Sequence, residues 1–265
     1  MIIRLDKYLA DSGYGTRSEV RSFLRIGKIR INGSVVKDGA LKIDTDKDEV
    51  SVDGENIEYS RYEYYMLHKP AGVISASGDK KEKTVVDLIE SKKRRDLFPV
   101  GRLDRDTEGL LIITNDGDMA HRLLSPKKHI EKCYRAIVSG ELPEDAAERF
   151  RDGIDIGDEK LTKEAYYREL EISEALEDKY LKERYERLKE ISEDAEEEYK
   201  KLAIVELRIT EGRYHEIKRM FTQLGCKVEY LKRYSMGNVS LDEKLSPGEY
   251  RTLTEDELKF LKDSV

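Results

Sequence analysis

The sequence contains no tryptophan, only two cysteines and no apolar run long enough to cross a lipid bilayer. Cys133 and Cys226 lie far apart and outside any CxxC pattern, which argues against a disulfide scaffold and against a cysteine-based zinc site. The first residues are charged and lack the apolar stretch of a secretory signal. These absences exclude a transmembrane protein, and they predict a protein of the reducing cytoplasm.

Patterns that bind cofactors are missing as well. The sequence has neither a GxGxxG pattern nor a P-loop, so nothing in it supports a nucleotide cofactor. Its four histidines show no spacing typical of a zinc site or of a Ser-His-Asp triad. We therefore expect a protein that works without a metal ion and without a nucleotide cofactor.

Charge, by contrast, is abundant: 40% of the residues are Asp, Glu, Lys or Arg, whereas an average globular protein has about 25%. The net charge is -7, but residues 171–200 alone contribute -6, from twelve acidic and six basic residues. Residues 1–37 contribute +5, from eight basic and three acidic residues. The distribution of charge decides which surface a polyanion would contact, so the N-terminal segment can bind one despite the negative total.

Residues 1–60 are predicted to form a small separate domain. Thr16-Arg-Ser-Glu19 matches a capping box, so we expect a helix that begins there and runs to about Ile26. Asn32-Gly33 lies between two short apolar runs and predicts a β-hairpin, because Asn-Gly readily adopts the positive φ of a type I′ turn. Residues 59–62 are the expected linker.

Residues 61–265 are predicted to form a second domain of the α+β class with a mixed, mainly antiparallel sheet, because runs of strands are interspersed with single helices. We expect strands at 64–67, 110–114, 132–138, 202–210 and 228–234 and one that ends near 100, helices at 214–224 and after 254, and a turn at 115–118. The whole chain therefore reads as a small N-terminal module followed by a larger α+β domain.

Residues 171–200 differ from the rest of this domain. They contain no glycine or proline and are dense in charge, and they place four apolar residues on one helical stripe: Leu181, Tyr185, Leu188 and Ala195. We expect a charged, solvated insertion of one long helix or two packed helices, which projects from the domain and carries no chemistry.

A basic surface is predicted on the N-terminal domain. Arg17, Arg21 and Arg25 follow one another at i, i+4 and i+8, so they line one face of the same helix. Such a row can follow a phosphate backbone through salt-sensitive contacts, although a solvated helix face shows the same pattern. With cations of the hairpin and of the preceding helix, the expected RNA-binding set is Arg4, Lys7, Arg17, Arg21, Arg25, Lys28 and Arg30.

A polar loop between two apolar strands has the sequence Gly101-Arg-Leu-Asp-Arg-Asp-Thr-Glu-Gly109, in which three carboxylates alternate with two arginines. Oxygen ligation of magnesium is one interpretation, but Arg102 and Arg105 would compete for the carboxylates. A glycosidase-like carboxylate pair is a second, and one nucleophilic or basic carboxylate held by an arginine is a third. A salt-bridged surface turn is the alternative without chemistry.

A third group of charged residues, after the basic surface and the polar loop, follows the strand predicted at 202–210. Arg213, Lys218 and Arg219 lie at the start of the next helix, where cations and the helix N-terminus together suit an anion. His215 is a candidate general base, but a single histidine without a partner is weak evidence.

Taken in order, these motifs resemble a known family. Arg4-Leu-Asp-Lys-Tyr-Leu-Ala10, the helix from Thr16 and Ile29-Arg-Ile-Asn-Gly-Ser-Val-Val36 resemble an S4 RNA-binding domain. Segments of the second domain resemble the ordered motifs of the RsuA-type pseudouridine synthases: Phe98 to Leu111, Ser125-Pro126 with Glu131 to Ala136, Glu211 to Phe221, and Leu245 to Leu258. The resemblance covers nearly the whole chain except 171–200.

The resemblance implies roles for five residues. Asp104 is the implied catalytic aspartate, and Arg102 is implied to help displace the target base from its stack. Tyr134 corresponds to an active-site tyrosine that stacks on the uracil and is a candidate for removing the C5 proton. Lys218 matches the basic residue that pairs with the aspartate, and Ile217 matches an apolar wall of the pocket.

The segment Leu161-Thr-Lys163 is similar to one that members of the small-subunit branch of the family carry, so the chain resembles this branch most closely. The resemblance implies conversion of one uridine of 16S rRNA to pseudouridine. The expected partner is rRNA or a small-subunit assembly intermediate, and the expected state is a monomer. Two alternative functions stay open. One is a 23S rRNA synthase of the same group, and the other is a non-catalytic S4-domain RNA-binding or ribosome assembly factor. A glycoside hydrolase using Asp104 and Asp106 is a weaker alternative, because the chain has no tryptophan to bind sugars.

Overall fold

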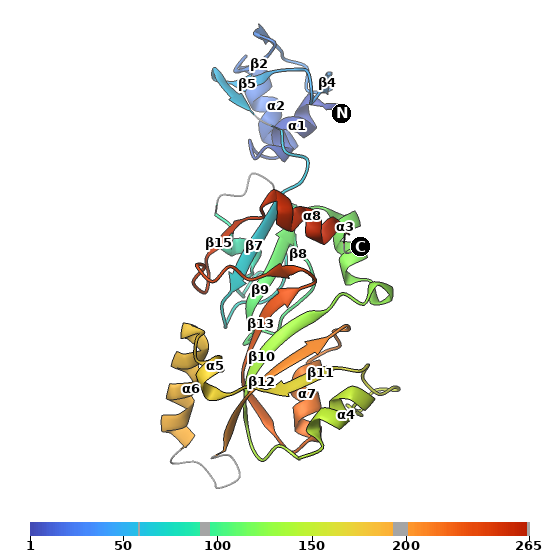
Figure 1. Ribbon diagram of the computed structural model, residues 1–265. Coiled ribbons are helices and arrows are strands. Elements are labelled where there is room, and N and C mark those ends of the chain that lie inside the picture. The colour runs from blue at the N-terminus through green and yellow to red at the C-terminus, as the bar shows by residue number, and fades with distance from the viewer. Residues whose placement is uncertain (58, 91–95, 193–200, 264–265) are drawn as a thin grey trace. The chain divides into compact units, whose positions relative to one another are not determined.

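The computed structural model describes residues 1–57, 59–90, 96–192 and 201–263. The chain divides into two compact units (Figure 1). The first comprises Met1–Glu63, Ile89–Phe98 and Thr114–Asp116, and the second comprises Tyr64–Leu88, Pro99–Ile113 and Gly117–Val265. No helix among the described residues combines the length and the apolar character that a membrane span requires.

The first unit packs two helices with short strands. The helices are α1 (Leu5–Asp11) and α2 (Arg17–Arg25), and the strands are β1 (Ile2–Arg4), β2 (Ile29–Ile31), β3 (Ser34–Val35), β4 (Lys42–Asp44), β5 (Val50–Val52) and β6 (Glu55–Ile57). Four strands form a sheet in the order β3-β2-β5-β6, and β1 pairs with β4. Leu5, Leu9, Val20, Leu24 and Ile29 are almost fully buried between the helices and strands and form the centre of the core.

Local signals in the sequence explain the start of α2 and the hairpin between β2 and β3. Thr16 Oγ1 accepts a hydrogen bond from the backbone of Glu19 at 3.3 Å, and the Glu19 carboxylate accepts one from the backbone of Thr16 at 2.6 Å. This confirms the predicted capping box at the start of α2. Asn32 and Gly33 both have positive φ, and Arg30 pairs with Val35, which confirms the predicted hairpin.

One basic residue lies elsewhere than predicted. We expected Arg4 on the first helix, but it ends β1 and forms the N-cap of α1. Its guanidinium bonds the buried carboxylate of Asp6 at 2.7 and 3.0 Å. The prediction was wrong because an arginine before an apolar run shows no sign of the short strand that precedes the helix.

The second unit is built on a large sheet. Its strands are β7 (Tyr64–Lys69), β8 (Phe98–Pro99), β9 (Glu108–Thr114), β10 (Lys132–Ser139), β11 (Tyr166–Glu169), β12 (Leu202–Ile209), β13 (Lys227–Met236), β14 (Val239–Ser240) and β15 (Tyr250–Thr252). The main path runs β11-β12-β10-β13-β9-β7-β15. The pairs that β10 forms with β12 and β13 are antiparallel, whereas β9 lies parallel to β13. This confirms the predicted α+β class with a mixed, mainly antiparallel sheet.

Helices flank the sheet. They are α3 (Gly117–Leu124), α4 (Ala146–Asp152), α7 (Glu216–Gln223) and α8 (Glu255–Asp263), with 3-10 turns η1 (Val86–Leu88) and η2 (Pro126–Lys128). The helix expected after 254 is present as α8, and Thr254 and Glu257 cap its start through mutual hydrogen bonds of 2.9 and 3.2 Å. The turn predicted at 115–118 was wrong in part, since α3 begins at Gly117 and buries Met119 and Leu123. The turn-forming sequence Asn-Asp-Gly-Asp obscured this short amphipathic helix.

The charged insertion was predicted to project from the domain, but one face of its described part packs on the sheet. Its described part forms α5 (Ile172–Ala175) and α6 (Lys179–Ser192), whereas the stripe residue Ala195 lies outside the described residues. Leu181 is fully buried in a cluster with Ile137 and Tyr230 of the sheet. Figure 1 shows α5 and α6 on one side of β10, β12 and β13, with α4 and α7 on the other.

Ion pairs and hydrogen bonds attach the insertion to the sheet. Asp178 accepts hydrogen bonds from Lys232 and from the hydroxyl of Tyr234, each at 2.6 Å. The guanidinium of Arg184, on α6, donates to Glu108 Oε1 at 2.9 Å. Lys232 and Glu108, which belong to the sheet, are almost fully buried. Most charged residues of α6 itself are exposed, as expected for a solvated face, among them Lys182, Glu183 and Glu186. Sequence composition shows the charge run but not the sheet residues with which Asp178 and Arg184 pair.

Strands β9 and β13 meet along only two residue pairs, Glu108 with Lys232 and Gly109 with Arg233, which we call the β9–β13 junction. Gly109 has a φ of 106°, and a Cβ atom there would lie 2.2 Å from the carbonyl oxygen of Arg233. A side chain at this position therefore forces the two backbones apart, in addition to the strain of positive φ.

We predict that Gly109→Ala lowers the free energy of unfolding by about 3 kcal/mol, because the backbone contact and the positive φ both exclude a methyl group. Gly117→Ala is the matched control, since Gly117 lies in the first turn of α3 and an added methyl group would meet no atom within 4 Å. Urea denaturation followed by circular dichroism measures both. Equal midpoints for the two variants would contradict the prediction.

Candidate active site

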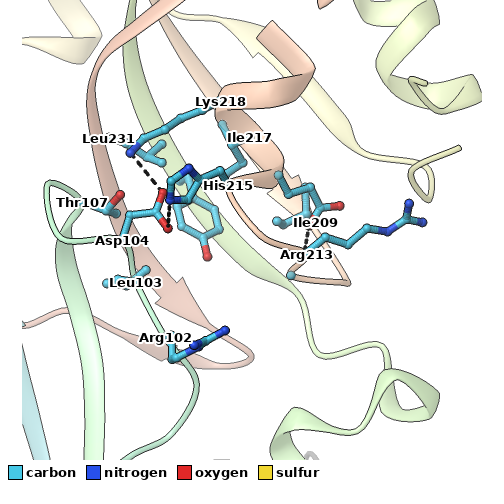
Figure 2. Close-up of a pocket in the computed structure, with 13 residues that line it drawn as sticks. Arg102, Leu103, Asp104, Thr107, Ile209, Arg213, His215, Ile217, Lys218 and Leu231 are labelled. Carbon is cyan, nitrogen blue, oxygen red and sulfur yellow. Dashed lines mark hydrogen bonds and ion pairs between the residues drawn. The ribbon is translucent and has the colours of Figure 1, made fainter. Parts of the chain in front are cut away.

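All five residues to which the resemblance gives roles in the site line one pocket (Figure 2). Arg102 and Asp104 come from the loop that precedes β9, Tyr134 from β10, and Ile217 and Lys218 from the first turn of α7. Segments more than 100 residues apart in the sequence therefore meet at one point. The loop from β12 to α7 and strand β13 supply further lining residues, among them His215 and Leu231.

The loop that carries Asp104 is held on both sides. Before it, Ser75 Oγ accepts a hydrogen bond from the backbone of Leu103 at 3.1 Å and donates to the carbonyl of Leu103 at 2.8 Å. After it, Nζ of Lys69 donates to the carbonyls of Arg105 at 3.1 Å and Thr107 at 2.8 Å. Asp104 therefore projects from a backbone that is hydrogen-bonded on each flank.

Lys69 holds the loop that carries Asp104, and the sequence did not point to this role. The side chain is fully buried, and this burial lowers the pKa of Lys69 to about 8. The Lys69-Pro70 dipeptide gave only the signal of a strand end. A lysine at the inner end of an otherwise apolar strand was the available sign, because a buried lysine needs several acceptors.

The ammonium group of Lys218 joins two carboxylates. Its Nζ lies 3.0 Å from Oδ2 of Asp104 and 2.5 Å from Oδ1 of Asp106. Burial acts to lower the pKa of Lys218, but the hydrogen bonds to Asp106 and Asp104 outweigh it, so that the pKa is raised. Lys218 is therefore a permanent cation beside Asp104 over the physiological range of pH.

The arginines of the loop do not compete for these carboxylates, contrary to our expectation. Arg105 forms an ion pair of 3.2 Å with Glu82 and donates to the carbonyl of Gly72. Arg102 is exposed at the pocket and forms no ion pair within the part of the chain that the structure describes. The same part of the chain contains no group of three His, Cys, Asp or Glu side chains placed to hold a metal ion.

His215 makes a contact that the sequence did not show. Nε2 of His215 lies 3.5 Å from Oδ1 of Asp104, on the other oxygen from the one that faces Lys218. His215 has a φ of 49°, the left-handed conformation, and its ring stacks on that of Tyr214 with centroids 3.9 Å apart. Because this contact depends on an unusual backbone conformation, residue spacing alone could not predict it.

Two further cations of this region do not form the predicted anion site. Arg219 and Arg213 both bond to Asp158, Arg219 at 2.6 Å and Arg213 at 3.5 Å. Arg213 also donates to the carbonyls of Lys160 and Leu161, each at 2.7 Å. These arginines therefore fasten the segment around 158–161 to the start of α7.

The opposite wall of the pocket is apolar. Tyr134, Ile209, Ile217 and Leu231 are each no more than 6% exposed. An apolar wall beside one charged group is a lining that suits a planar, uncharged ring. The arrangement is suited to chemistry on a nucleobase or a similar ring by one oriented carboxylate.

The seven predicted RNA-binding cations divide into two groups. Arg17, Arg21 and Arg25 are exposed along α2 and form no ion pair with any residue that the structure describes. The other four are each bonded within the unit: Arg4 to Asp6, Lys7 to Asp11, Lys28 to Asp53, and Arg30 to the carbonyl of Gly33. The α2 arginines are therefore the cations most available to a polyanion.

Both parts of the chain match known protein families. The profile of the RNA pseudouridylate synthase family matches residues 63–223, and that of the S4 domain matches residues 3–55. The RNA pseudouridine synthase YtzG of Bacillus subtilis is 42% identical over 98% of this chain and 99% of its own. Ribosomal small subunit pseudouridine synthase A of Vibrio cholerae is 37% identical over 97% of this chain and 98% of its own.

A solved structure also matches nearly the whole chain. The crystal structure of a pseudouridylate synthase is 34% identical, covers 98% of this chain and 99% of that chain, and superposes with a TM-score of 0.61.

Glu216, which lines the pocket, forms a carboxyl pair with Glu211. The backbone of Lys163 donates to Glu211 at 2.7 Å, and that of Arg213 donates to Glu216 at 2.8 Å. Glu216 is almost fully buried. Burial, together with the hydrogen bond to Glu211, raises the pKa of Glu216 above its ordinary value.

We predict that Glu216→Gln makes the folded protein less sensitive to alkaline pH. A raised pKa in the folded state means that this carboxyl contributes stability below the ordinary glutamate pKa and loses that contribution as pH rises through the raised value. Glutamine resembles the protonated carboxyl at every pH. The variant should therefore gain on the order of 1 kcal/mol over the wild type between pH 5 and pH 8.

Thermal or urea unfolding across this pH range is the measurement. Glu148→Gln, at an exposed position on α4, is the control for the loss of one negative charge. A constant difference between Glu216→Gln and the wild type at every pH would show that Glu216 does not hold an extra proton in the folded state.

Proposed function

The chain belongs to the RNA pseudouridylate synthase family, and we propose that it converts one uridine of 16S ribosomal RNA to pseudouridine with Asp104 as the catalytic carboxylate. The observation that carries the proposal is the Lys218–Asp104 ion pair of 3.0 Å facing the apolar wall of Tyr134 and Ile217 in one pocket. The small-subunit target is supported by the names of relatives such as the Vibrio cholerae protein.

The reaction breaks the N1–C1′ bond of uridine, turns the uracil and joins its C5 atom to C1′. N1 gains a proton and C5 loses one, so the atoms balance without an oxidant, a metal ion or a nucleotide. Asp104, as an anion, attacks C1′ or removes a proton from the ribose in the two mechanisms that the family resemblance implies. Lys218 orients the carboxylate and balances its charge.

The pocket has to accept the uracil after it leaves its stack. Flipping a base out of a nucleic acid costs a few kcal/mol. Arg102 is exposed at the pocket, where it can occupy the space that the base vacates. Tyr134 stacks on the ring and is the candidate to remove the C5 proton, while Ile217 helps to exclude water that would hydrolyse the intermediate.

We assign RNA binding to residues 1–60 and catalysis to residues 61–265, with the insertion at 171–200 as part of the catalytic domain. The exposed row Arg17, Arg21 and Arg25 is the proposed contact to the phosphate backbone. The enzyme acts as a monomer in the cytoplasm on rRNA or on a small-subunit assembly intermediate, and uses no cofactor.

The target is tested by mapping pseudouridines in rRNA from cells that lack the gene, and again after complementation. We predict that wild type restores one lost 16S pseudouridine and that Asp104→Asn does not. Loss of a 23S pseudouridine instead would keep the reaction and change the target. If no pseudouridine is lost, a role as a non-catalytic assembly factor would replace the proposed function.

In a purified assay, Asp104→Asn should reduce kcat by at least about 1,000-fold, because an amide has no negative charge with which to attack or to accept a proton. Its affinity for the RNA should stay within about threefold of wild type, since Asp104 contributes one contact among many. Tritium release from C5-labelled uridine measures the rate, and filter binding measures affinity. Normal turnover would rule out Asp104 as the catalytic residue.

Reversal of two charges tests the RNA-binding surface. Arg21→Glu with Arg25→Glu should weaken RNA binding and reduce the slope of log K against log salt by about 2, one for each lost phosphate contact. The control is Lys42→Glu with Lys47→Glu, which makes the same charge change at exposed residues outside the proposed surface. An equal effect of both double variants would mean that only the net charge matters.

A further inference from the structure

An exposed aromatic ring lies directly beside the catalytic pocket. Tyr214, in the loop between β12 and α7, is 72% exposed, although its neighbours His215 and Glu216 both line the pocket. An exposed tyrosine at this place has no part in the core. It also takes no part in the mechanism proposed above.

The ring of Tyr214 is one layer of a stack that begins at the catalytic carboxylate. His215 has Nε2 at 3.5 Å from Oδ1 of Asp104, and its other neighbour is the ring of Tyr214. The two rings have centroids 3.9 Å apart and an interplanar angle of 16°, which is a face-to-face arrangement. The inner face of Tyr214 is therefore covered by His215, whereas most of the side chain remains open to solvent.

The backbone beneath this stack is held in place. His215 adopts the left-handed conformation, which is uncommon for a residue other than glycine. Nη1 of Arg219 donates to the carbonyl of Tyr214 at 3.2 Å, and the backbone of Arg213 donates to Glu216 at 2.8 Å. The loop thus presents the tyrosine at a defined distance from Asp104.

We propose that the outer face of Tyr214 binds the base of a nucleotide that directly adjoins the target uridine in the RNA strand. This inference rests on the proposed function, which brings the ribose of the target uridine to Asp104. When that uridine leaves the stack, its neighbours lose a stacking partner. An exposed aromatic ring beside the pocket supplies a replacement, as aromatic side chains do for unstacked bases of single-stranded RNA.

The proposed subsite takes a nucleobase by its flat face and accepts any of the four bases, because stacking does not depend on a hydrogen-bonding edge. The site would hold the strand in the orientation in which C1′ of the target faces Asp104. Tyr214 therefore acts on binding more than on the chemical step, and its removal should raise KM with little change in kcat.

The test combines a protein variant with an RNA that lacks one base. The RNA is a hairpin that contains the mapped target uridine, made intact or with an abasic residue at the 5′ or at the 3′ neighbour. We expect Tyr214→Ala to raise KM about tenfold on the intact RNA, and Tyr214→Phe, which keeps the ring, to recover most of this loss. Tyr166→Ala, at an exposed tyrosine of β11 outside the pocket, is the control.

On one of the two abasic RNAs, the wild type and Tyr214→Ala should have the same KM, because the base that stacks on Tyr214 is gone. Equal KM values for these two proteins on the intact RNA would overturn the inference. A loss in Tyr214→Ala that persists on both abasic RNAs would also overturn it, since Tyr214 would then act only by positioning His215. Absence of turnover of the intact RNA by the wild type would instead refute the proposed function, and the inference with it.

Discussion

The backbone contact at the β9–β13 junction is the constraint on which the catalytic unit depends. Strand β9 meets β13 along two residue pairs, and these pairs join the β11-β12-β10-β13 part of the sheet to the β9-β7-β15 part. Gly109 permits the contact because it has no side chain, and Arg233 strengthens it by donating from Nε to the carbonyl of Leu110 at 2.8 Å. The loop with Asp104 ends where the junction begins, so the junction sets the position of the carboxylate.

Lys218, on α7, supplies the positive charge that faces Asp104. One ammonium group balances both Asp104 and Asp106, so two carboxylates can lie close together without strong mutual repulsion. The arginines of the same loop are turned away from these carboxylates: Arg105 pairs with Glu82, and Figure 2 shows the side chain of Arg102 extending away from Asp104. This leaves one oxygen of Asp104 near His215 and the other near Lys218, which fixes the orientation of the carboxylate before any substrate arrives.

The features predicted correctly from the sequence are those that short segments determine. The capping box at Thr16 and the Asn32-Gly33 hairpin depend on residues that are neighbours in the chain, and both are present. The α3 helix was missed because its first residues also suit a turn. The contact of His215 with Asp104 and the burial of Lys69 were missed because they arise only when distant segments fold together. The five pocket residues with implied roles came from the family resemblance and not from their spacing.

The insertion at 171–200 also makes contacts with distant segments that the sequence does not show, and these contacts affect the site. Its charges suggested a solvated helix, yet Arg184 of α6 and the hydroxyl of Tyr230 both donate to Glu108, each at 2.9 Å. Glu108 is the first residue of β9 and belongs to the β9–β13 junction. A buried carboxylate at this place needs such partners, because an unpaired charge there would weaken the pairing of the two strands. The insertion therefore supports, from the opposite face of the sheet, the same strand that positions Asp104.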